Sequence, residues 1–427
     1  MSSVPVRVGV LGYGNVGGAL VRLLDTDGSS IAARTGIRLE VARVAVRDVT
    51  ENRRSALPDG CLTGDAEAVV SDPNVDVVVE VMGGVEPARG LVLAALKNGK
   101  PVVTANKELL ADAGAELFEA AAASGVDLLY EASVAGAIPL IRLLRESLAG
   151  ERITRVMGIV NGTTNYILTR MSEDGASYAE GLEEAQRLGY AERDPTADVE
   201  GIDAAAKAAI VASIAFGTRV VAGDVHREGI SNVSPDDIAF ARRLGYVVKL
   251  LAVAERSGDE VAVRVHPAMV PASHPLAAVR DSFNAVFIEG EAVGELMLYG
   301  RGAGGTPTAS AVLGDLVDAA HNLRAGGSGR TAALDRAGVR PIEELSSEYY
   351  LNIDVVDRPG VLARVAAVFG DHGVSIRSME QEGLGEKARL VFITHTAREG
   401  DVQGTIRDLR RLDAVKRIGS LLRVVGT

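Results

Sequence analysis

The chain is poor in the residues from which several common kinds of site are built. Among its 427 residues there is one cysteine, Cys61, so an internal disulfide and a zinc site of cysteine thiolates are excluded. Its six histidines show no HExxH or other paired-ligand spacing, which argues against a transition-metal centre. A GxSxG elbow and a Walker-type GxxxxGK[ST] loop are also missing, so a serine hydrolase and a P-loop ATPase are unsupported. Chemistry must rest on lysine, aspartate or glutamate, or on a bound cofactor.

Positive charge and long apolar segments are scarce as well. Lysine and arginine number 45 against 57 aspartates and glutamates, which gives a net charge of -12. Such a chain, without a basic run, repels phosphate backbones, so we expect no nucleic-acid partner. No basic and apolar leader opens the chain, and no stretch of about 18 uncharged apolar residues occurs. We therefore expect a cytoplasmic protein with no membrane partner.

Apolar residues are plentiful at 47%, enough for two or three domains of about 150 residues each. Residues 1–134 alternate strands with helices, and VDVVVEVMGG (75–84) is typical of a strand buried on both faces. This alternation predicts an α/β fold with a Rossmann-type doubly wound parallel sheet. We expect a helix at 306–322 to complete that domain.

The pattern changes twice further along the chain. Over residues 135–305 helices dominate and alternate with strands such as RVMGIVNG, which predicts a mixed α+β catalytic and dimerisation domain. The glycine-rich segment 323–346 is interpreted as a linker. Residues 347–427 then run as strand, helix, strand, strand, helix, strand, which predicts a compact α+β module.

A glycine-rich turn near the N-terminus indicates a cofactor. The sequence GYGNVG matches GxGxxG and lies between a predicted strand and a predicted helix. Glycine serves the tight turn, the close approach of backbone to a pyrophosphate and the packing of helix on strand, and the helix N-terminus offers free N–H groups. The predicted dinucleotide-binding residues are Gly12, Tyr13, Gly14, Asn15, Val16 and Gly17.

The residues after the second strand bear on which nicotinamide cofactor binds. Arg47 precedes Asp48, and Arg53 and Arg54 follow closely. An acidic residue there suits a free ribose 2′-hydroxyl, whereas arginine suits a 2′-phosphate. Arg47 and Arg54 therefore favour NADP(H), but NAD(H) stays open because solvated surface arginines explain the pattern equally well.

Two lysines are the candidates for catalysis. Lys107 follows the strand of PVVTANKELL, at the carboxyl end of the sheet where open α/β sheets bind ligands. Lys207 stands four residues after Asp203 in GIDAAAKAAIVASIAF, an otherwise apolar helix. An exposed ion pair would contribute little, but these neighbours resemble core, where charges are kept when paired or functional. Two ammonium groups in one pocket would bind a carboxylate or carbonyl substrate and polarise its oxygen.

Several segments together resemble homoserine dehydrogenase over about residues 5–322. They are GYGNVG, VVTANKELL, YEASVAGAIPLI, IVNGTTNYIL, GYAERDPTADVEGIDAAAKAAI and YGRGAGGTPTA, in the family's order and spacing. The resemblance implies reversible reduction of L-aspartate 4-semialdehyde to L-homoserine with NAD(P)H, in threonine, methionine and isoleucine biosynthesis. It also implies a homodimer or homotetramer.

The resemblance assigns roles to particular residues. Lys207 would donate a proton to the aldehyde oxygen, with Lys107 near both nicotinamide and substrate. Glu192 and Asp203 would hold the homoserine amino group and neighbouring polar atoms. Further cofactor contacts would come from Thr104, Gly189, Gly304 and Gly305. A sodium ion would be held, largely through backbone carbonyls, by Glu131, Val134, Gly136 and Ile138.

The last segment, with YYLNIDVVDRPGVLARVAAVFGDHGVSI, resembles ACT domains. Gly360 permits close approach to a helix N-terminus, which is a ready site for an amino-acid carboxylate. The resemblance implies an amino-acid effector, with threonine expected, and a module that pairs with its copy. A pairing module without a ligand stays open.

Two other interpretations are weaker. A dehydrogenase of another sugar or amino-acid type should lack the GYAERDPTADVEG loop, which this chain has. An amino-acid-binding regulatory protein with an inactive dehydrogenase half is disfavoured by the intact set Lys107, Glu192, Asp203 and Lys207.

Overall fold

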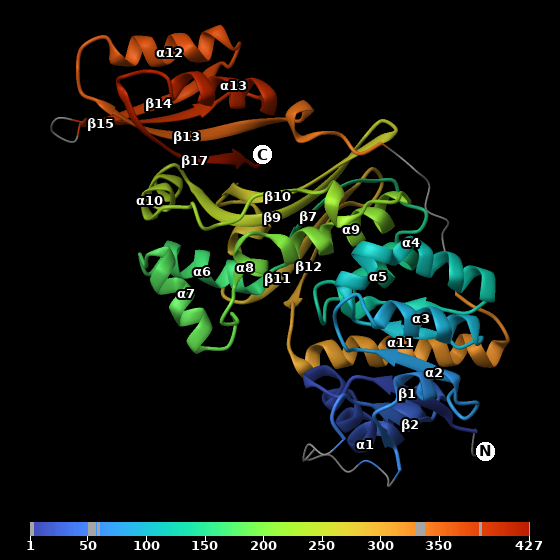
Figure 1. Cartoon of the computed structure of the whole chain (residues 1–427). Coiled ribbons are helices and arrows are strands. Elements are labelled where there is room, and N and C mark those ends of the chain that lie inside the picture. Colours follow the sequence, from blue (N-terminus) through green and yellow to red (C-terminus); the bar gives the residue numbers. More distant parts are fainter. Residues whose placement is uncertain (1–3, 50–56, 58–59, 330–337, 384–386, 427) are drawn as a thin grey trace. The chain divides into compact units, whose positions relative to one another are not determined.

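The computed structural model describes residues 4–49, 57, 60–329, 338–383 and 387–426 (Figure 1). The chain forms two compact units. The first comprises Met1–Arg152, Ala209–Ala222 and Leu298–Arg336, and the second comprises Ile153–Ala208, Gly223–Met297 and Ala337–Thr427.

The first unit is built on a parallel sheet whose strand order is β3-β2-β1-β4-β5-β6. The strands are β1 (Val6–Leu11), β2 (Leu39–Ala45), β3 (Leu62–Thr63), β4 (Val77–Glu80), β5 (Val102–Thr104) and β6 (Leu128–Leu129). The chain winds outward from β1 in one direction and then from β4 in the other. The predicted Rossmann-type sheet is confirmed, and the reversal between β1 and β4 is the place where such sheets bind ligands.

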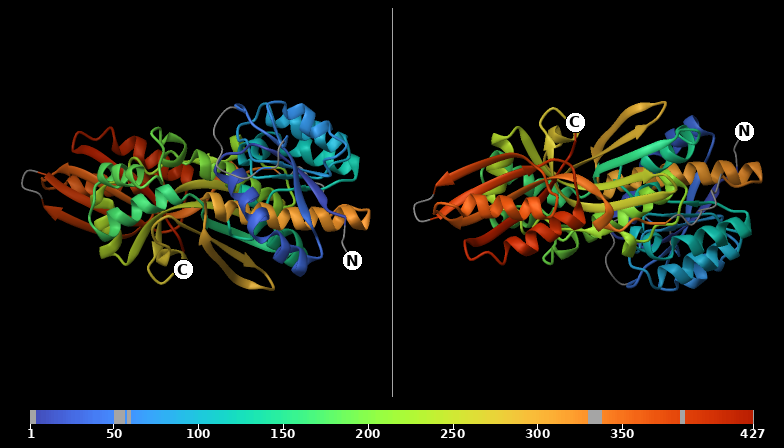
Figure 2. Two further views of the ribbon diagram at one scale, coloured as in Figure 1. Left: turned by 90° about the horizontal axis from the view of Figure 1, so that it is seen from below. Right: turned by 90° about the horizontal axis from the view of Figure 1, so that it is seen from above.

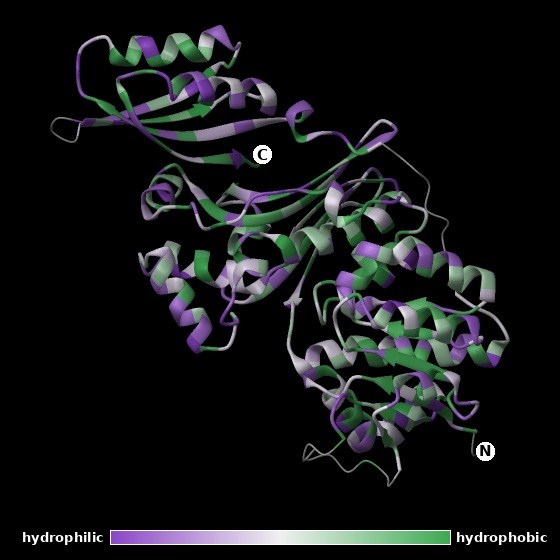
Figure 3. Cartoon of the chain, in the orientation of Figure 1, coloured by the Kyte–Doolittle hydropathy of each residue, from purple (hydrophilic) through white to green (hydrophobic). Residues whose placement is uncertain are grey.

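Helices cover this sheet. They are α1 (Asn15–Thr35), α2 (Ala66–Ser71), α3 (Ala88–Lys97), α4 (Lys107–Ser124) and α11 (Gly305–Ala325), and the short α5 (Leu140–Arg142) follows β6 in the chain. α1 and α11 pack side by side (Figure 2). Val8, Val10, Val77 and Val79 are fully buried against them, and the strands are correspondingly hydrophobic (Figure 3). Burial on both faces explains the uninterrupted apolar runs of these strands.

The second unit has a mixed sheet of order β12-β11-β7-β9-β10-β17-β13-β15-β14. The strands that precede the C-terminal module (residues 347–427) are β7 (Ile153–Ile159), β8 (His226–Arg227), β9 (Tyr246–Ser257), β10 (Glu260–Pro271), β11 (Phe283–Gly290) and β12 (Gly294–Arg301). The helices are α6 (Gly162–Glu173), α7 (Tyr178–Arg187), α8 (Thr196–Val199), α9 (Ile202–Phe216) and α10 (Pro235–Arg243). The residues of α9 from Ala209 and those of β12 from Leu298 belong to the first unit. We call this part of the second unit the α+β lobe.

The C-terminal module has the predicted order of strands and helices. It contains β13 (Ser346–Val356), α12 (Val361–Asp371), β14 (Ile376–Gly383), β15 (Lys387–Thr394), β16 (Ala397–Arg398), α13 (Glu399–Leu409) and β17 (Val415–Val424). Both helices cover the same face of the strands (Figure 1). Its core includes Tyr349, Val365, Phe369 and Phe392, and the last two rings are 4.9 Å apart. β17 pairs in parallel with β10 at Ala268 and Arg423, so the module continues the sheet of the lobe.

A buried carboxylate joins the α+β lobe to the C-terminal module. Asp237, on α10, is fully buried. Its Oδ1 accepts hydrogen bonds from the hydroxyl of Tyr350 at 3.1 Å and the amide of Asn352 at 3.0 Å. Its Oδ2 accepts from the hydroxyls of Ser234 at 2.7 Å and Ser420 at 2.8 Å. The Asp237 carboxylate thus accepts hydrogen bonds from the start of α10, from β13 and from β17. Buried donors require such acceptors.

Arg423 makes a second buried link. Its guanidinium lies 2.9 Å from Glu399 in the module and 2.8 Å from Glu228 in the lobe, and its side chain is 3% exposed. Burial alone would raise the pKa of Glu228, but hydrogen bonds from His226 and Arg423 outweigh it and hold that pKa well below its usual range. The contact between the module and the lobe therefore contains buried charges of opposite sign that are paired with one another. Removing one partner would leave the other buried and unpaired.

We expect Asp237→Ala to lower the free energy of unfolding by about 2–4 kcal/mol, because it leaves buried hydroxyl and amide donors without an acceptor. Urea unfolding followed by circular dichroism measures this. The control is Asp236→Ala, which removes a half-exposed partner of Arg389 and should cost less than about 1 kcal/mol. Equal losses in the two variants would contradict the role given to Asp237.

Candidate functional site

The glycine turn of the first unit is shaped by steric contacts with neighbouring backbone. A Cβ atom on Gly17 would lie 2.2 Å from the carbonyl oxygen of Gly12, and one on Gly12, where φ is 105°, would lie 2.8 Å from that of Val81. A Cβ on Gly14 would meet nothing within 4 Å. Gly12 and Gly17 thus serve the turn and its packing, while Gly14 borders open space where a phosphate can approach the backbone.

The start of α11 lies against the same turn. A Cβ on Gly305 would be 2.8 Å from the carbonyl oxygen of Asn15, and Gly304 has φ of 122°, which favours glycine. The structure therefore brings Gly304 and Gly305 to the predicted cofactor turn. Arg47 is exposed beyond the end of β2, and Arg53 and Arg54 lie outside the described residues.

At the carboxyl end of the parallel sheet, a buried acid organises the start of α4. Glu80 is fully buried and accepts a hydrogen bond at 2.6 Å from the hydroxyl of Thr104. Asn106 caps α4 by accepting from the N–H of Leu109 at 3.1 Å, and Lys107, half-buried, is the first helical residue. Burial raises the pKa of Glu80. The Thr104 hydroxyl thus holds the Glu80 carboxylate in place. Glu80 was not among the residues predicted to form the site.

Lys207 lies in a buried polar cluster of the second unit. Its ammonium group is 2.7 Å from Oδ2 of Asp203 and 2.7 Å from the carbonyl oxygen of Val160. The whole Lys207 residue is 9% exposed and Asp203 is 8% exposed, so the predicted i, i+4 pair is present and buried. The two hydrogen bonds use two of the three N–H donors of a lysine, which leaves one for a substrate oxygen.

Asn161 connects this pair to α8. Its amide donates to Asp203 at 2.9 Å and to Asp198 at 2.7 Å, and its carbonyl oxygen caps α6 through the N–H of Thr164. Burial raises the pKa of Asp198, the hydrogen bond from Asn161 lowers it, and the charge of Asp203 raises it further. Asn161 was not among the residues predicted to form the site, although an asparagine before the helix-starting Gly162 is a recognisable cap signal.

The loop predicted to hold the substrate amino group is exposed. Glu192 has an exposed side chain, and its backbone carbonyl accepts from Gln186 at 3.1 Å. Gly189 has φ of 76° in the turn that ends α7. No hydrogen bond or ion pair among the described residues joins the Glu192 carboxylate to the Asp203 and Lys207 pair. Lys107 belongs to the first unit and Lys207 to the second.

The segment predicted to hold sodium lies at the start of α5. Both carboxylate oxygens of Glu131 accept backbone N–H groups at 2.8 Å, from Ile141 and Arg142. The carbonyl oxygen of Ile138 accepts the N–H of Leu140. Gly136, with φ of 56°, packs so closely that a Cβ would lie 2.6 Å from the backbone of Gly302. Among the described residues no group of three or more histidines, cysteines, aspartates or glutamates could hold a metal ion.

The fold and the glycine turn define a dehydrogenase of the nicotinamide-dependent class. A family described as homoserine dehydrogenase matches residues 139–317, its NAD-binding domain matches 12–131, and the ACT domain matches 349–414. None of the helices that the structure describes has the length and hydropathy that a membrane-spanning segment requires.

Proteins of similar sequence and structure match this chain along nearly its whole length. The homoserine dehydrogenase of Corynebacterium glutamicum is 52% identical, over 98% of this chain and 95% of that protein. That of Mycobacterium tuberculosis is 52% identical, over 99% and 98%. The crystal structure of a homoserine dehydrogenase from Thiobacillus denitrificans has a TM-score of 0.94 at 42% identity, covering 99% of this chain and 98% of that one. The chain belongs to the homoserine dehydrogenase family and is an NAD(P)-dependent oxidoreductase.

Asp315, on α11, carries the pH dependence that we expect for the first unit. Its carboxylate accepts from the N–H of Glu131 at 2.8 Å and lies 3.2 Å from Arg142. Burial raises the pKa of Asp315 to about 7; the charge of Glu131 adds to this, while the hydrogen bond and Arg142 oppose it. In the unfolded chain the pKa of this carboxyl group is about 3.9. The raised pKa in the folded state therefore contributes stability that is fully present below pH 4. That contribution is lost as the pH rises through 7.

We expect wild-type protein to lose more unfolding free energy between pH 5 and pH 8 than Asp315→Asn, because the amide does not titrate. The difference should be on the order of 2 kcal/mol. Asp318→Asn, which removes a half-exposed carboxylate of the same helix, should change the pH dependence less. Identical pH profiles for wild type and Asp315→Asn would show that this carboxyl group titrates normally.

Proposed function

We propose that the chain catalyses the reversible reduction of L-aspartate 4-semialdehyde to L-homoserine in the formation of threonine, methionine and isoleucine. The observation that carries the proposal is the buried Lys207 and Asp203 pair, fixed by Asn161 and the carbonyl of Val160. A buried ammonium group with a remaining N–H donor suits an oxygen that gains negative charge. The close relatives named homoserine dehydrogenase support the same conclusion.

The chemistry that bound NADPH supplies is delivery of a hydride to the aldehyde carbon. As the carbonyl oxygen gains charge, the Lys207 ammonium group stabilises it and transfers a proton to it, giving the hydroxyl of homoserine. Asp203 holds the ammonium group in position. In the reverse direction the neutral amine takes the hydroxyl proton.

We assign the remaining contacts as the family resemblance implies. Glu192, an acidic side chain on an exposed loop, would bind the substrate amino group together with Asp203. Lys107, at the carboxyl end of the sheet, would lie near nicotinamide and substrate. The cofactor would lie on the turn from Gly12 to Gly17 and reach further residues of the chain, namely Arg47, Arg54, Thr104, Gly189, Gly304 and Gly305.

A sodium ion is proposed at Glu131, Val134, Gly136 and Ile138. Carbonyl oxygens suit a hard cation, and no described hydrogen bond engages the carbonyls of Val134 and Gly136. The fit is partial, because Leu140 already donates to the carbonyl of Ile138. The ion would order the backbone before α5 rather than take part in the reaction.

Regulation is proposed for the C-terminal module, with threonine as effector, and a homodimer or homotetramer as the assembly. The match to the ACT domain over residues 349–414 supports a small-molecule effector. Turnover that stays constant as threonine is added would contradict this part of the proposal.

We expect Lys207→Ala to reduce turnover by about 10²- to 10⁴-fold, the range that a proton donor contributes, while NADPH binding is retained. Steady-state kinetics with aspartate semialdehyde and fluorescence titration with NADPH measure the two quantities. The control is Lys249→Ala, which removes another buried lysine of the same unit, one bonded to Asn165. It should lower stability but not the turnover of folded protein. Turnover near the wild-type value in Lys207→Ala would reject this residue as the acid.

We expect the chain to prefer NADPH, and Arg47→Ala to raise the KM for NADPH about tenfold with little change for NADH, because a guanidinium binds only the 2′-phosphate. Arg34→Ala, which removes an exposed arginine at the end of α1, is the matched control. Equal use of both cofactors by the intact protein would refute the preference.

A further inference from the structure

Asn284, near the start of β11, has a buried side-chain amide without a hydrogen-bond partner. The residue is 1% exposed, and no described residue bonds to its Oδ1 or its Nδ2. The other buried asparagines that the structure describes all bond to neighbouring groups; they are Asn106, Asn161, Asn165 and Asn352. Since a buried amide without a partner destabilises the fold, its presence requires an explanation, and a bound ligand supplies one.

Strand pairing places Asn284 on the face of the sheet that carries Val160. Ala285 pairs with Ile159 in the antiparallel register of β11 and β7, so one further step sets Asn284 opposite Val160. Both side chains lie on the face opposite to the apolar core that contains Ala285 and Ile159. Directly opposed residues have Cβ atoms about 4.5–5.5 Å apart. The cross-strand neighbour of Asn284 is thus the residue whose carbonyl accepts from Lys207 at 2.7 Å.

The start of α9 packs on this face of the sheet. A Cβ on Gly201, the residue before α9, would lie 3.3 Å from a methyl carbon of Val265. Val265 of β10 and Gly158 of β7 both pair with the same residue of β9. Gly158 precedes Val160 by two residues and so shares its face. Lys207 and the unpaired amide therefore lie on the same side of the sheet, and both belong to the second unit.

The chain just before Asn284 is held against the start of α6. The side-chain amide of Asn165 donates to the carbonyl of Asp281 at 2.9 Å, and Asp281 has φ of 53°, which is uncommon outside glycine. A Cβ on Gly162 would lie 2.7 Å from the carbonyl oxygen of Ser282, so the two segments are in contact. These contacts fix the start of β11 against α6, and a rigid frame of this kind suits a substrate-binding group.

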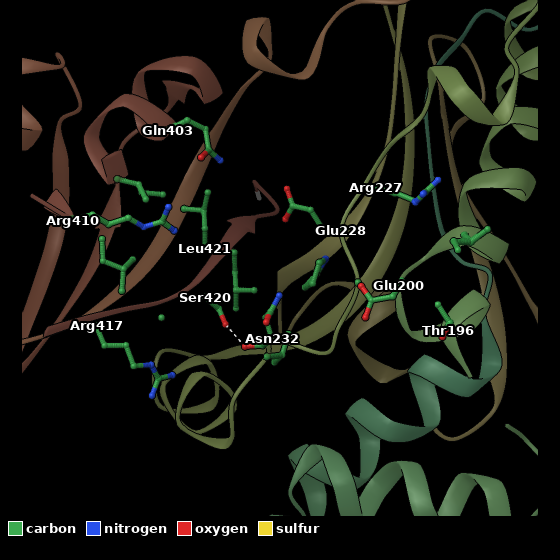
Figure 4. A pocket seen from close by; sticks show the side chains of 18 residues that line it. Thr196, Glu200, Arg227, Glu228, Asn232, Gln403, Arg410, Arg417, Ser420 and Leu421 are labelled. Carbon is green, nitrogen blue, oxygen red and sulfur yellow. Dashed lines mark hydrogen bonds between the residues drawn. The ribbon is translucent and has the colours of Figure 1, made fainter. Parts of the chain in front are cut away.

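A cavity of about 860 Å³ in the second unit gives this amide no partner. Figure 4 shows the cavity, with Thr196 and Glu200 among the residues that line it. Neither Asn284 nor Lys207 is among those residues. A ligand in that cavity would therefore leave the amide unpaired, whereas a substrate held at Lys207 would lie on the face that the amide shares.

We propose that Asn284 is a further catalytic residue, whose Nδ2–H donates a hydrogen bond to the carbonyl oxygen of the substrate. The inference rests on the proposed function. Lys207 supplies one N–H to that oxygen and Asn284 supplies a second, so that two donors stabilise the negative charge that develops as the hydride arrives. Both amide atoms of Asn284 are closed to water in the structure, and a hydrogen bond in such a setting stabilises charge more than one in water does.

Asn284→Leu tests the proposal, because leucine has nearly the same shape and lacks the N–H. The kcat for reduction of aspartate semialdehyde should fall by about 10²- to 10³-fold, the loss expected for one donor to a developing oxyanion. The KM for the semialdehyde should change by less than about threefold, because the interaction is made mainly in the transition state. The urea concentration at the midpoint of unfolding should rise, since an apolar group replaces an unpaired buried amide. A purely structural role would instead lower that midpoint.

The control is Val286→Ala, which alters the packing of a buried residue on the same face of β11. It should lower the unfolding midpoint and keep kcat within about twofold of wild type. If Asn284→Leu does not fold, Asn284→Ala gives the same kinetic comparison.

Three results would each overturn the inference. They are a kcat within about twofold of wild type in the Asn284 variants, a rise in KM alone, and a lowered unfolding midpoint in Asn284→Leu. A wild type that does not reduce aspartate semialdehyde would instead refute the proposed function, and the inference would fall with it.

Discussion

The buried ion pair between Lys207 and Asp203 is the interaction that organises the polar centre of the second unit. An ammonium group is costly to bury unless charge and hydrogen bonds compensate it. Compensation comes from the carboxylate of Asp203 and from the carbonyl of Val160, just beyond the end of β7. Asn161, the cap of α6, holds Asp203 in turn. The starts of α6 and α9 and the end of β7 must therefore meet at one point.

A second constraint is that the C-terminal module and the α+β lobe share one sheet. β17 pairs with β10 on one side and with β13 on the other, and the buried side chains of Asp237 and Arg423 bond to residues of both parts. Continuous backbone pairing and compensated buried charge resist separation of the two parts. A change in the module can thus reach the α+β lobe through these contacts.

The sequence predicted the features that depend on local pattern. GYGNVG predicted the strand, turn and helix of the first unit, because Gly12 and Gly17 answer steric needs of the turn and its packing. The spacing of Asp203 and Lys207 predicted their pairing because both lie on one helix. Glu80 with Thr104, Asn161 with Asp198 and the pairing of β17 with β10 escaped prediction. They join residues that are distant in sequence, and only tertiary packing decides which of many polar side chains meet.

In the proposed function, Lys207 donates a proton to the substrate oxygen. A crystal structure of the complex with NADPH and homoserine tests it most directly. We expect the Lys207 ammonium nitrogen to lie about 3 Å from the homoserine hydroxyl. A substrate bound on the glycine turn or elsewhere, with Lys207 making only its contacts to Asp203 and Val160, would contradict it.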